Sequence, residues 1–360
     1  MPSRPARLAI YLSSHGFGHT TRTAVVLEEL IRDIDCELYV RASTPRRLWP
    51  ASLEAVTRSW VAERCDAGVI QTSDIEVDQV ATGREIEAWA RGHDDAVREE
   101  AQRLESAAID LVIGDVPPLA FDAAAAAGIA SVAVANFSWD WIYEAMGFAD
   151  AAGVAARAYA TAERLIELEP FAPMDAFRER RSVGIIGRSS PRDRDPVRAE
   201  LGVDPSRRLV LIAFREPSAG MLALPPPVDD VSFVFPSAVA ARPDVITAPD
   251  SMSFWDLMCA SDCVLAKPGY GIIGDTAVTG TRLLYTERPA FPEDVVLRKW
   301  LSGREGAAAV APDRLRDGSW GEEMAALLES PAPVAVGDSG VKRAAAEIED
   351  SLAAARADSG

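Results

Sequence analysis

Two of the three histidines in the chain stand in one short loop, in the string SSHGFGHTTR at residues 13–22. Gly16 and Gly18 allow the backbone to turn tightly and to approach a ligand closely, so we expect both to contact a donor substrate. A histidine in such a loop is suited to act as a general base near neutral pH. In a purely structural loop, His15 and His19 would bond the backbone instead. The strict dinucleotide fingerprint GxGxxG is absent, which disfavours NAD.

Asp115 follows an apolar run and precedes two prolines. Its carboxylate could orient a histidine, as the acid of a catalytic triad does, or it could cap the helix that follows; the sequence leaves both open. The string NFSWDWIY at residues 136–143 follows the next apolar run. Its aromatic rings and polar groups suit contact with a sugar or an apolar acceptor, while some of the rings pack in the core. We expect acceptor contacts from Asn136, Trp139 and Asp140.

The string AKPGYGIIGD at residues 266–275 carries a second set of glycines ahead of an expected helix. Free N–H groups at a helix start are a natural place for phosphate oxygens. We expect donor contacts from Lys267, Gly269, Tyr270 and Gly271. Asp275 is expected in the first turn, where a carboxylate accepts ribose hydroxyls or simply favours the helix dipole.

The elements that position these residues alternate between short strand-like runs and longer helical ones. Leu8–Ser13 and Leu111–Gly114 are expected strands, and Thr20–Ile31 and Arg84–Ala107 show helical spacing of apolar residues. Such alternation favours a parallel sheet with helices on both faces. We expect an α/β protein with two doubly wound Rossmann-like domains that face each other across a cleft.

The expected boundaries follow the places where this pattern weakens and resumes. Residues 170–195 contain three prolines and little periodicity, so residues 171–195 are predicted as the interdomain connection. The predicted parts are an acceptor-side domain at 1–170, that connection, a nucleotide-sugar domain at 196–335 and a C-terminal helix at 336–360.

Composition excludes several classes of protein. The chain has 360 residues and a net charge of −18, so it will not hold a nucleic-acid backbone by charge alone. Four scattered cysteines form neither a disulfide framework nor a paired CxxC zinc motif. No apolar stretch reaches the length that spans a bilayer, and the N-terminus lacks the features of a signal peptide. We expect a cytoplasmic protein without a transmembrane segment; its oligomeric state is left open.

Three strings carry a resemblance to a known family: HGFGHTTR, GDVPPLAFDAAAAAGIASVAVANFSWDWIY and SDCVLAKPGYGIIGD. They resemble the glycosyltransferase-like half of plant L-arabinokinases and a group of bacterial proteins of similar length. The layout is more distantly similar to the glycosyltransferase that adds N-acetylglucosamine in peptidoglycan synthesis. The resemblance runs from about residue 7 to 305 and implies the GT-B fold.

This resemblance also implies site roles. His19 would be the general base, with His15 second, and the acidic residue that holds the ribose corresponds to Asp275. The donor would bind mainly the C-terminal domain without a metal, because helix dipoles and backbone N–H groups offset the diphosphate charge. No cofactor is expected, since the nucleotide-sugar is a co-substrate.

Two departures from the family pattern concern the donor site. Relatives usually have Ser-Glu where this chain has Gly274-Asp275, and they carry a glycine-rich turn where this chain has FREPSAG at residues 214–220. Either Arg215 contacts the donor phosphate or the donor site has changed. The prediction is a metal-independent glycosyltransferase that uses a nucleotide-sugar, most simply a UDP-sugar, with an unknown acceptor. The alternatives are a non-catalytic sugar-nucleotide sensor or partner subunit, and a GT-B-fold sugar-nucleotide epimerase.

Overall fold

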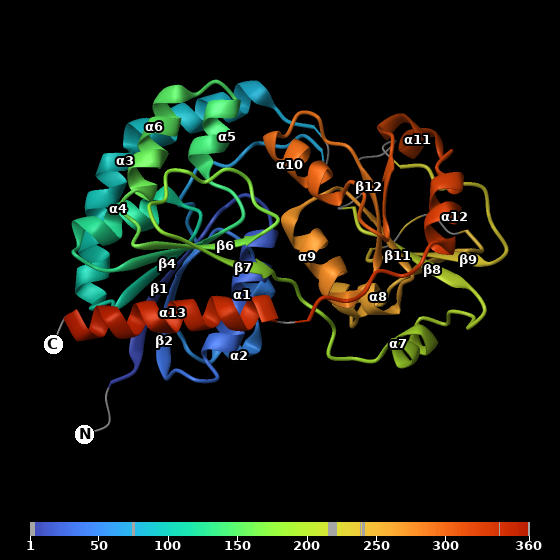
Figure 1. Cartoon of the computed structure of the whole chain (residues 1–360), viewed down its shortest axis with the longest axis horizontal. Coiled ribbons are helices and arrows are strands. Elements are labelled where there is room, and N and C mark those ends of the chain that lie inside the picture. Colours follow the sequence, from blue (N-terminus) through green and yellow to red (C-terminus); the bar gives the residue numbers. More distant parts are fainter. Residues whose placement is uncertain are drawn as a thin grey trace. The chain divides into compact units, whose positions relative to one another are not determined.

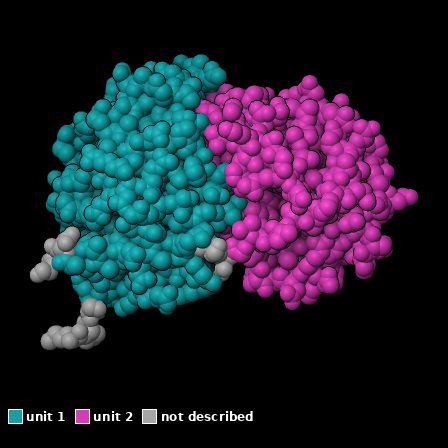
Figure 2. Space-filling view, in the orientation of Figure 1, with its two compact units in different colours: residues 1–70, 78–186, 338–360 teal, residues 71–77, 187–337 magenta. Residues whose placement is uncertain are grey.

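The computed structural model describes residues 4–73, 76–214, 222–237, 239, 242–337 and 339–358. The chain divides into two compact units, coloured separately in Figure 2. Unit 1 consists of Met1–Ile70, Asp78–Ile186 and Asp338–Gly360. Unit 2 consists of Gln71–Val77 and Gly187–Gly337. No helix in the described part of the chain has the length and apolar character needed to cross a membrane.

Unit 1 is built on a parallel sheet of seven strands in the order β3-β2-β1-β4-β5-β6-β7 (Figure 1). The strands are β1 (Ala6–Leu12), β2 (Cys36–Arg41), β3 (Thr57–Val61), β4 (Leu111–Asp115), β5 (Ser131–Ala135), β6 (Arg164–Glu169) and β7 (Arg180–Ile185). Strands β4 and β5 are buried along their whole length, as expected for parallel strands with helices on both faces. Leu12 at the end of β1 pairs with Asp115 at the end of β4, so the loops after both strands leave the same edge of the sheet.

The helices of unit 1 cover the sheet from two sides. They are α1 (Gly18–Leu30), α2 (Ala51–Glu54), α3 (Gln79–Ala107), α4 (Pro118–Ala126), α5 (Trp139–Ala145), α6 (Ala149–Tyr159) and α13 (Ser339–Asp358), with a short 3-10 turn η1 (Arg46–Leu48). Side chains of α1 and α13, among them Leu27 and Ile348, share one buried cluster with Leu8 and Ile10 of β1. Helices α3, α4 and α6 pack together elsewhere in the unit, and α4 lies against β4 and β5.

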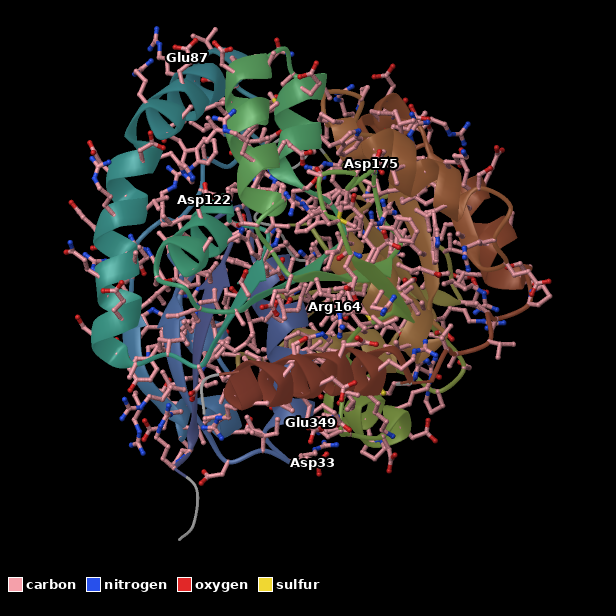
Figure 3. All side chains as sticks on the ribbon, turned by 60° about the vertical axis from the view of Figure 1, so that its left-hand side comes forward. Asp33, Glu87, Asp122, Arg164, Asp175 and Glu349 are labelled. Atoms are coloured by element: carbon pink, nitrogen blue, oxygen red, sulfur yellow. The ribbon has the colours of Figure 1, made fainter. Side chains whose placement is uncertain are left out.

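Charged side chains lie mainly on the outer surfaces of the helices. Figure 3 shows this for Glu87 of α3 and Glu349 of α13, both of which are exposed. Arg164 of β6, labelled in the same view, forms an ion pair of 2.8 Å with Glu347 of α13. The terminal helix is therefore fixed to unit 1 by apolar packing on its inner side and by this ion pair.

The segment 171–195 differs from the predicted interdomain connection, because part of it is a strand of unit 1. Strand β7 pairs in parallel with β6, and the chain passes into the main part of unit 2 between Ile186 and Gly187. The first three residues of β7, two arginines and a serine, are exposed. Gly184 has a φ of +84°, at the place where the pairing register between β6 and β7 shifts. An edge strand with an exposed polar half lacks the apolar alternation by which strands are recognised in a sequence.

Unit 2 contains a second parallel sheet, of six strands in the order β10-β9-β8-β11-β12-β13. The strands are β8 (Arg208–Ile212), β9 (Val231–Phe235), β10 (Val245–Thr247), β11 (Cys263–Ala266), β12 (Arg282–Thr286) and β13 (Ala307–Val310). The helices are α7 (Arg194–Glu200), α8 (Phe254–Ala260), α9 (Tyr270–Thr279), α10 (Pro292–Leu301), α11 (Pro312–Asp317) and α12 (Gly321–Glu329). The core includes the rings of Phe233 and Trp320, whose centres lie 5.9 Å apart. The predicted α/β class with two doubly wound parallel sheets is confirmed.

Candidate active site

The loop after β1 leads directly into α1, as the sequence predicts. Gly16 has a φ of +81°, a left-handed conformation that glycine adopts without steric cost. Helix α1 begins at Gly18 with no side-chain cap and no acidic residue in its first turn. A helix start of this kind presents backbone N–H groups and the positive end of the helix dipole.

His19 lies one residue into α1 and is buried against the end of β4. Its Nδ1 atom is 2.8 Å from Oδ1 of Asp115. Asp115 is fully buried, and the ring of Phe137 lies edge-on to the imidazole with the ring centres 5.5 Å apart. Among the residues that the structure describes, Nδ1 is the only ring nitrogen of His19 with a hydrogen-bond partner.

Asp115 is surrounded by donors from the first turns of α1. The Nε of Arg22 lies 2.9 Å from Oδ2 of Asp115, and Nη2 of the same guanidinium donates to Oδ1. The hydroxyl of Thr23 donates to Oδ2 over 2.5 Å. Burial by itself raises the pKa of Asp115, but the positive charge of Arg22 and the contact with His19 outweigh it and lower the pKa to about 2. Asp115 is therefore ionised at neutral pH.

The ionised carboxylate decides which nitrogen of His19 carries the proton. An ionised carboxylate only accepts hydrogen bonds, so Nδ1 must donate to Asp115. Nη2 of Arg22 also lies 2.9 Å from Nδ1, but it has Oδ1 of Asp115 as its acceptor. The Nδ1–H tautomer satisfies all three groups and leaves Nε2 as a proton acceptor. An imidazole held in this way can act as a general base. Asp115 does not cap α4, whose N-cap residue is Pro117.

His15 lies in the same loop but in a different environment. Its ring is edge-on to the indole of Trp139, with the centres 5.6 Å apart. A methyl group at Gly68 would lie 3.2 Å from Cβ and Nδ1 of His15. His15 is half-buried and is packed between these two residues. Within the described residues, the hydrogen bond of a ring nitrogen to Asp115 belongs to His19.

The structure places the predicted acceptor-binding residues mainly inside unit 1. Asn136 donates to the carbonyls of Leu168 and Pro170 and accepts from Arg22 over 2.6 Å. Trp139 is only 1% exposed, and its indole N–H donates to Asp66 over 2.8 Å. The polar groups of both side chains are thus engaged in holding the loops together, and this geometry gives no support to an acceptor contact by either.

Asp140, the third predicted acceptor residue, lies in the first turn of α5 and is half-buried. Burial raises the pKa of its carboxyl. The hydrogen bonds that this carboxyl forms with Ser138 and with nearby backbone lower the pKa, but they offset only part of the effect of burial. A carboxyl in this environment retains its proton to a higher pH than an exposed aspartate.

The glycine loop of unit 2 has the predicted form. It joins β11 to α9, and α9 has Gly269 as its N-cap residue with no side-chain cap. A methyl group at Gly269 would meet nothing within 4 Å, so the backbone there faces open space. Tyr270 is buried at the first position of the helix, while Lys267 and Gly271 are half-buried.

Asp275 differs from the prediction in both position and surroundings. Helix α9 begins at Tyr270 and its first turn contains no acidic residue, so Asp275 lies in the second turn. Its two carboxylate oxygens accept from the backbone N–H of Arg188 over 2.7 Å and from the indole N–H of Trp255 over 3.1 Å. Burial raises its pKa to about 6 despite these hydrogen bonds. The carboxylate is therefore used to fix neighbouring segments of unit 2. Arg215, the predicted phosphate ligand, lies outside the described residues.

Sequence reasoning missed several residues that build the site: Arg22, Thr23, Asp66 and Tyr159. Arg22 follows His19 by three residues, a spacing that places two side chains on one face of a helix, and this signal was available in the sequence. Asp66 bonds the N–H of Ser14 over 3.0 Å as well as the indole of Trp139. It lies in an irregular segment, for which the sequence contains no comparable periodic signal.

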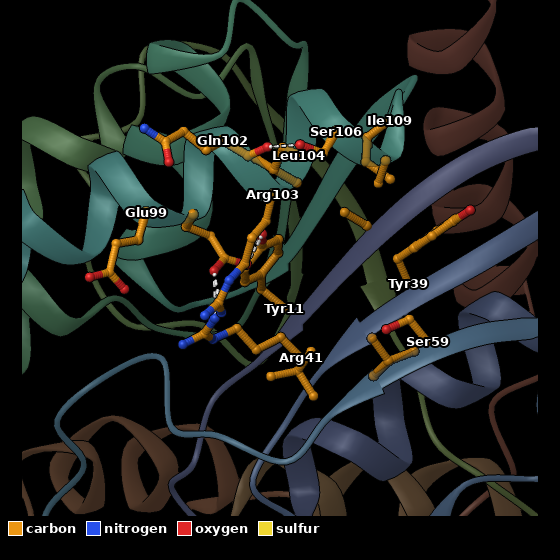
Figure 4. Close-up of a pocket in the computed structure, with 15 residues that line it drawn as sticks. Tyr11, Tyr39, Arg41, Ser59, Glu99, Gln102, Arg103, Leu104, Ser106 and Ile109 are labelled. Carbon is orange, nitrogen blue, oxygen red and sulfur yellow. Dashed lines mark hydrogen bonds and ion pairs between the residues drawn. The ribbon is translucent and has the colours of Figure 1, made fainter.

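A separate cavity of about 700 Å³ lies between α3 and the strands β1, β2 and β3 (Figure 4). At one end, Tyr11 donates to Glu100 over 2.7 Å and Arg41 forms an ion pair of 2.5 Å with the same carboxylate. The cavity lies where β2 alternates buried and half-exposed residues, so that one face of the strand is not fully covered. His19 is not among the residues that line it.

The chain is similar in sequence to a plant protein. No protein-family model matches it. It is 29% identical to L-arabinokinase from Arabidopsis thaliana over 332 residues, which is 87% of this chain. The chain spans 31% of the length of that relative. The predicted resemblance to plant L-arabinokinases is confirmed.

Solved structures share nearly the whole architecture at low identity. The glycosyltransferase SnogD from Streptomyces nogalater has a TM-score of 0.59 at 16% identity, covering 97% of this chain and 96% of that chain. MurG from Acinetobacter baumannii has a TM-score of 0.56 at 13% identity, covering 97% and 99%. The chain has the GT-B fold. A putative UDP-N-acetylglucosamine 2-epimerase from Listeria monocytogenes also matches, with a TM-score of 0.55 at 12% identity and 94% of each chain covered. The GT-B fold by itself therefore does not specify the reaction.

Proposed function

We propose that this GT-B chain is a glycosyltransferase that moves a sugar from a nucleotide-sugar, most simply a UDP-sugar, to an acceptor. The observation that carries the proposal is the buried pair of His19 and Asp115. The pair fixes the Nδ1–H tautomer and leaves Nε2 as an acceptor at the start of α1. The fold, which the chain shares with solved glycosyltransferases such as SnogD, supports the same class of reaction.

In the proposed reaction, Nε2 of His19 takes the proton of the nucleophilic group of the acceptor. The nucleophile forms a bond to the anomeric carbon as the bond from that carbon to the diphosphate oxygen breaks. The nucleoside diphosphate leaves with the bonding electrons. Asp115 stabilises the imidazolium that forms, in the way the acid of a catalytic triad does.

The donor diphosphate is proposed to bind at the glycine loop before α9. The uncapped helix start and the open space at Gly269 would let phosphate oxygens approach backbone N–H groups. A helix dipole and such N–H groups offset negative charge, so the reaction needs no metal ion. Arg215 is proposed as a further ligand of the donor phosphate, because a guanidinium binds a phosphate through two parallel hydrogen bonds.

Turnover of a panel of nucleotide-sugars by the purified chain tests the function. Nucleoside diphosphate should be released in the presence of a competent acceptor, and EDTA should leave the rate unchanged. Arg215→Ala should weaken nucleotide binding by about 1.5–3 kcal/mol, the usual size for a hydrogen bond to a charged group. A strict requirement for Mg²⁺ or Mn²⁺ would contradict the proposed charge compensation.

One observation favours a second candidate, a non-catalytic partner subunit or a sensor that binds a sugar nucleotide without a ribose contact from Asp275. Both oxygens of Asp275, the residue that corresponds to the ribose-binding acid of the relatives, are already hydrogen-bonded within unit 2. A sensor would bind a nucleotide-sugar and raise its own melting temperature without releasing nucleoside diphosphate. Thermal shift and turnover, measured on the same donor panel, separate the two candidates.

A further inference from the structure

The residue that follows Asp115 has a strained backbone. Val116 has a φ of +82° and is fully buried. A β-branched residue in this left-handed region is a genuine outlier, and such a conformation costs about 1–3 kcal/mol unless the surroundings enforce it. Because Val116 is bonded to Asp115, its conformation sets the direction in which the chain leaves β4.

One phenol enforces this turn. The hydroxyl of Tyr159, the last residue of α6, donates to the carbonyl oxygen of Val116 over 2.8 Å. The same hydroxyl accepts from the backbone N–H of Trp139 over 3.0 Å, at the start of α5. It therefore joins the turn after β4 to the loop after β5.

The Tyr159 ring itself is held firmly. It is fully buried, and the rings of Phe177 and Phe121 pack against it with centre distances of 4.7 Å and 5.7 Å. Burial raises the pKa of Tyr159 well above its ordinary value. The phenol is therefore protonated at neutral pH, so it donates and accepts at the same time.

Both histidines of the site depend on the two segments that Tyr159 joins. Asp115, next to Val116, orients His19. The indole of Trp139 packs against the ring of His15. We propose that Tyr159 is a positioning residue for the reaction: its hydroxyl holds the strained Val116 turn and the Trp139 backbone so that Asp115 presents its carboxylate to His19. The catalytic part of this inference rests on the proposed function.

The test compares Tyr159→Phe with Tyr11→Phe. Each variant removes one buried phenol hydroxyl from unit 1, since Tyr11 is 2% exposed and donates to Glu100. Nitrogen-15 NMR of the labelled histidines reports which ring nitrogen of His19 carries the proton and needs no substrate. Tyr159→Phe should lose the fixed Nδ1–H signal and lower kcat about 100-fold, the size expected for a misplacement near 1 Å. The donor KM should change little, and Tyr11→Phe should keep both the His19 signal and kcat.

The addition of Val116→Gly tests the strain itself. Glycine adopts the left-handed conformation without the penalty that valine pays, so Tyr159→Phe combined with Val116→Gly should regain the Nδ1–H signal and much of kcat. If Tyr159→Phe alone fails to fold, the double variant carries the comparison with the parent. A folded double variant without the signal would overturn the role of strain at Val116.

Two results would overturn the positioning role. The first is a Tyr159→Phe protein that keeps the His19 signal and kcat while losing as much thermal stability as Tyr11→Phe. The second is an equal loss of the His19 signal in both variants. If the parent turns over no donor, the NMR comparison still decides whether Tyr159 positions His19, so a failure of the proposed function is distinguished from a failure of this inference.

Discussion

Gly187 lies directly against the backbone of Gly274. A methyl group at Gly187 would come within 2.3 Å of the carbonyl carbon of Gly274, closer than real contacts allow. The next residue, Arg188, donates its backbone N–H to Asp275 and lies with its guanidinium 4.7 Å from the ring centre of Trp255. The segment that enters unit 2 is thus fixed on α9, the helix that follows the candidate phosphate loop.

The crowding at Gly187 and the open space at Gly269 predict different outcomes when each glycine is replaced by alanine. Gly187→Ala should destabilise unit 2 by about 1–3 kcal/mol or more, because the neighbouring atoms are backbone and cannot turn aside. Gly269→Ala should leave stability nearly unchanged, since its methyl group would enter open space, while it should weaken nucleotide binding if the loop holds phosphate. Urea denaturation and nucleotide titration of the two variants check this pair. Equal stability of the two proteins would contradict the packing argument.

The raised pKa of Asp275 predicts that the stability of unit 2 depends on pH. Its pKa in the folded protein is raised from 3.8 to about 6 by burial, so the fold disfavours the ionised form. The stability that this group contributes is therefore greatest below about pH 4 and declines as the pH rises from about 4 to 6. Asp275→Asn remains neutral and should remove this decline from the pH profile of the urea midpoint. A profile of the same slope in the variant would show that other groups cause the decline.

Strongly apolar elements could be predicted closely from the sequence. The expected strand Leu111–Gly114 lies within β4, and the expected strand Leu8–Ser13 overlaps most of β1, because the residues of both strands are buried over most of their length. The edge strand β7 was missed, since exposed arginines at its start conceal the pattern. The order of apolar and polar residues along a short segment indicates how that segment is buried. An edge strand is only partly buried, so this pattern is weak there.

The candidate site was predicted in part for a similar reason. The loop with His19 and the end of β4 with Asp115 are local features, and parallel pairing of β1 with β4 brings them to one edge. The bond of Tyr159 to Val116 joins positions that are 43 residues apart. No local pattern indicates such a contact, because it depends on how α6 packs in the finished fold.

Substitution of His19 tests the proposed base. His19→Ala should lower kcat by about 10²–10⁴-fold, the usual contribution of general acid–base catalysis, with donor binding near that of the parent. Asp115→Asn should also lower kcat, more mildly, because an amide can no longer hold the Nδ1–H tautomer as firmly. Steady-state kinetics and nucleotide titration on the same preparations check both. Full activity of His19→Ala would move the role to His15 or exclude base catalysis from this loop.

Arg22 should be essential for the stability of unit 1 in a pH-dependent way. Arg22→Met leaves the buried carboxylate of Asp115 without its main positive partner, and the loss of one member of a buried pair costs about 3–5 kcal/mol. In the parent, the pKa of Asp115 is lowered to about 2, so its contribution to stability is present above about pH 4 and is lost as the pH falls towards 2. The stability difference between parent and variant should therefore be largest near pH 7 and shrink in acid, where Asp115 becomes neutral in both proteins. Arg22→Lys is the matched control, because it keeps the charge but loses the planar group that reaches both Asp115 and Asn136, and it should fall between the two. Urea denaturation of the three proteins across this pH range decides the matter, and a difference that does not change with pH would mean that the role of Arg22 is packing rather than charge.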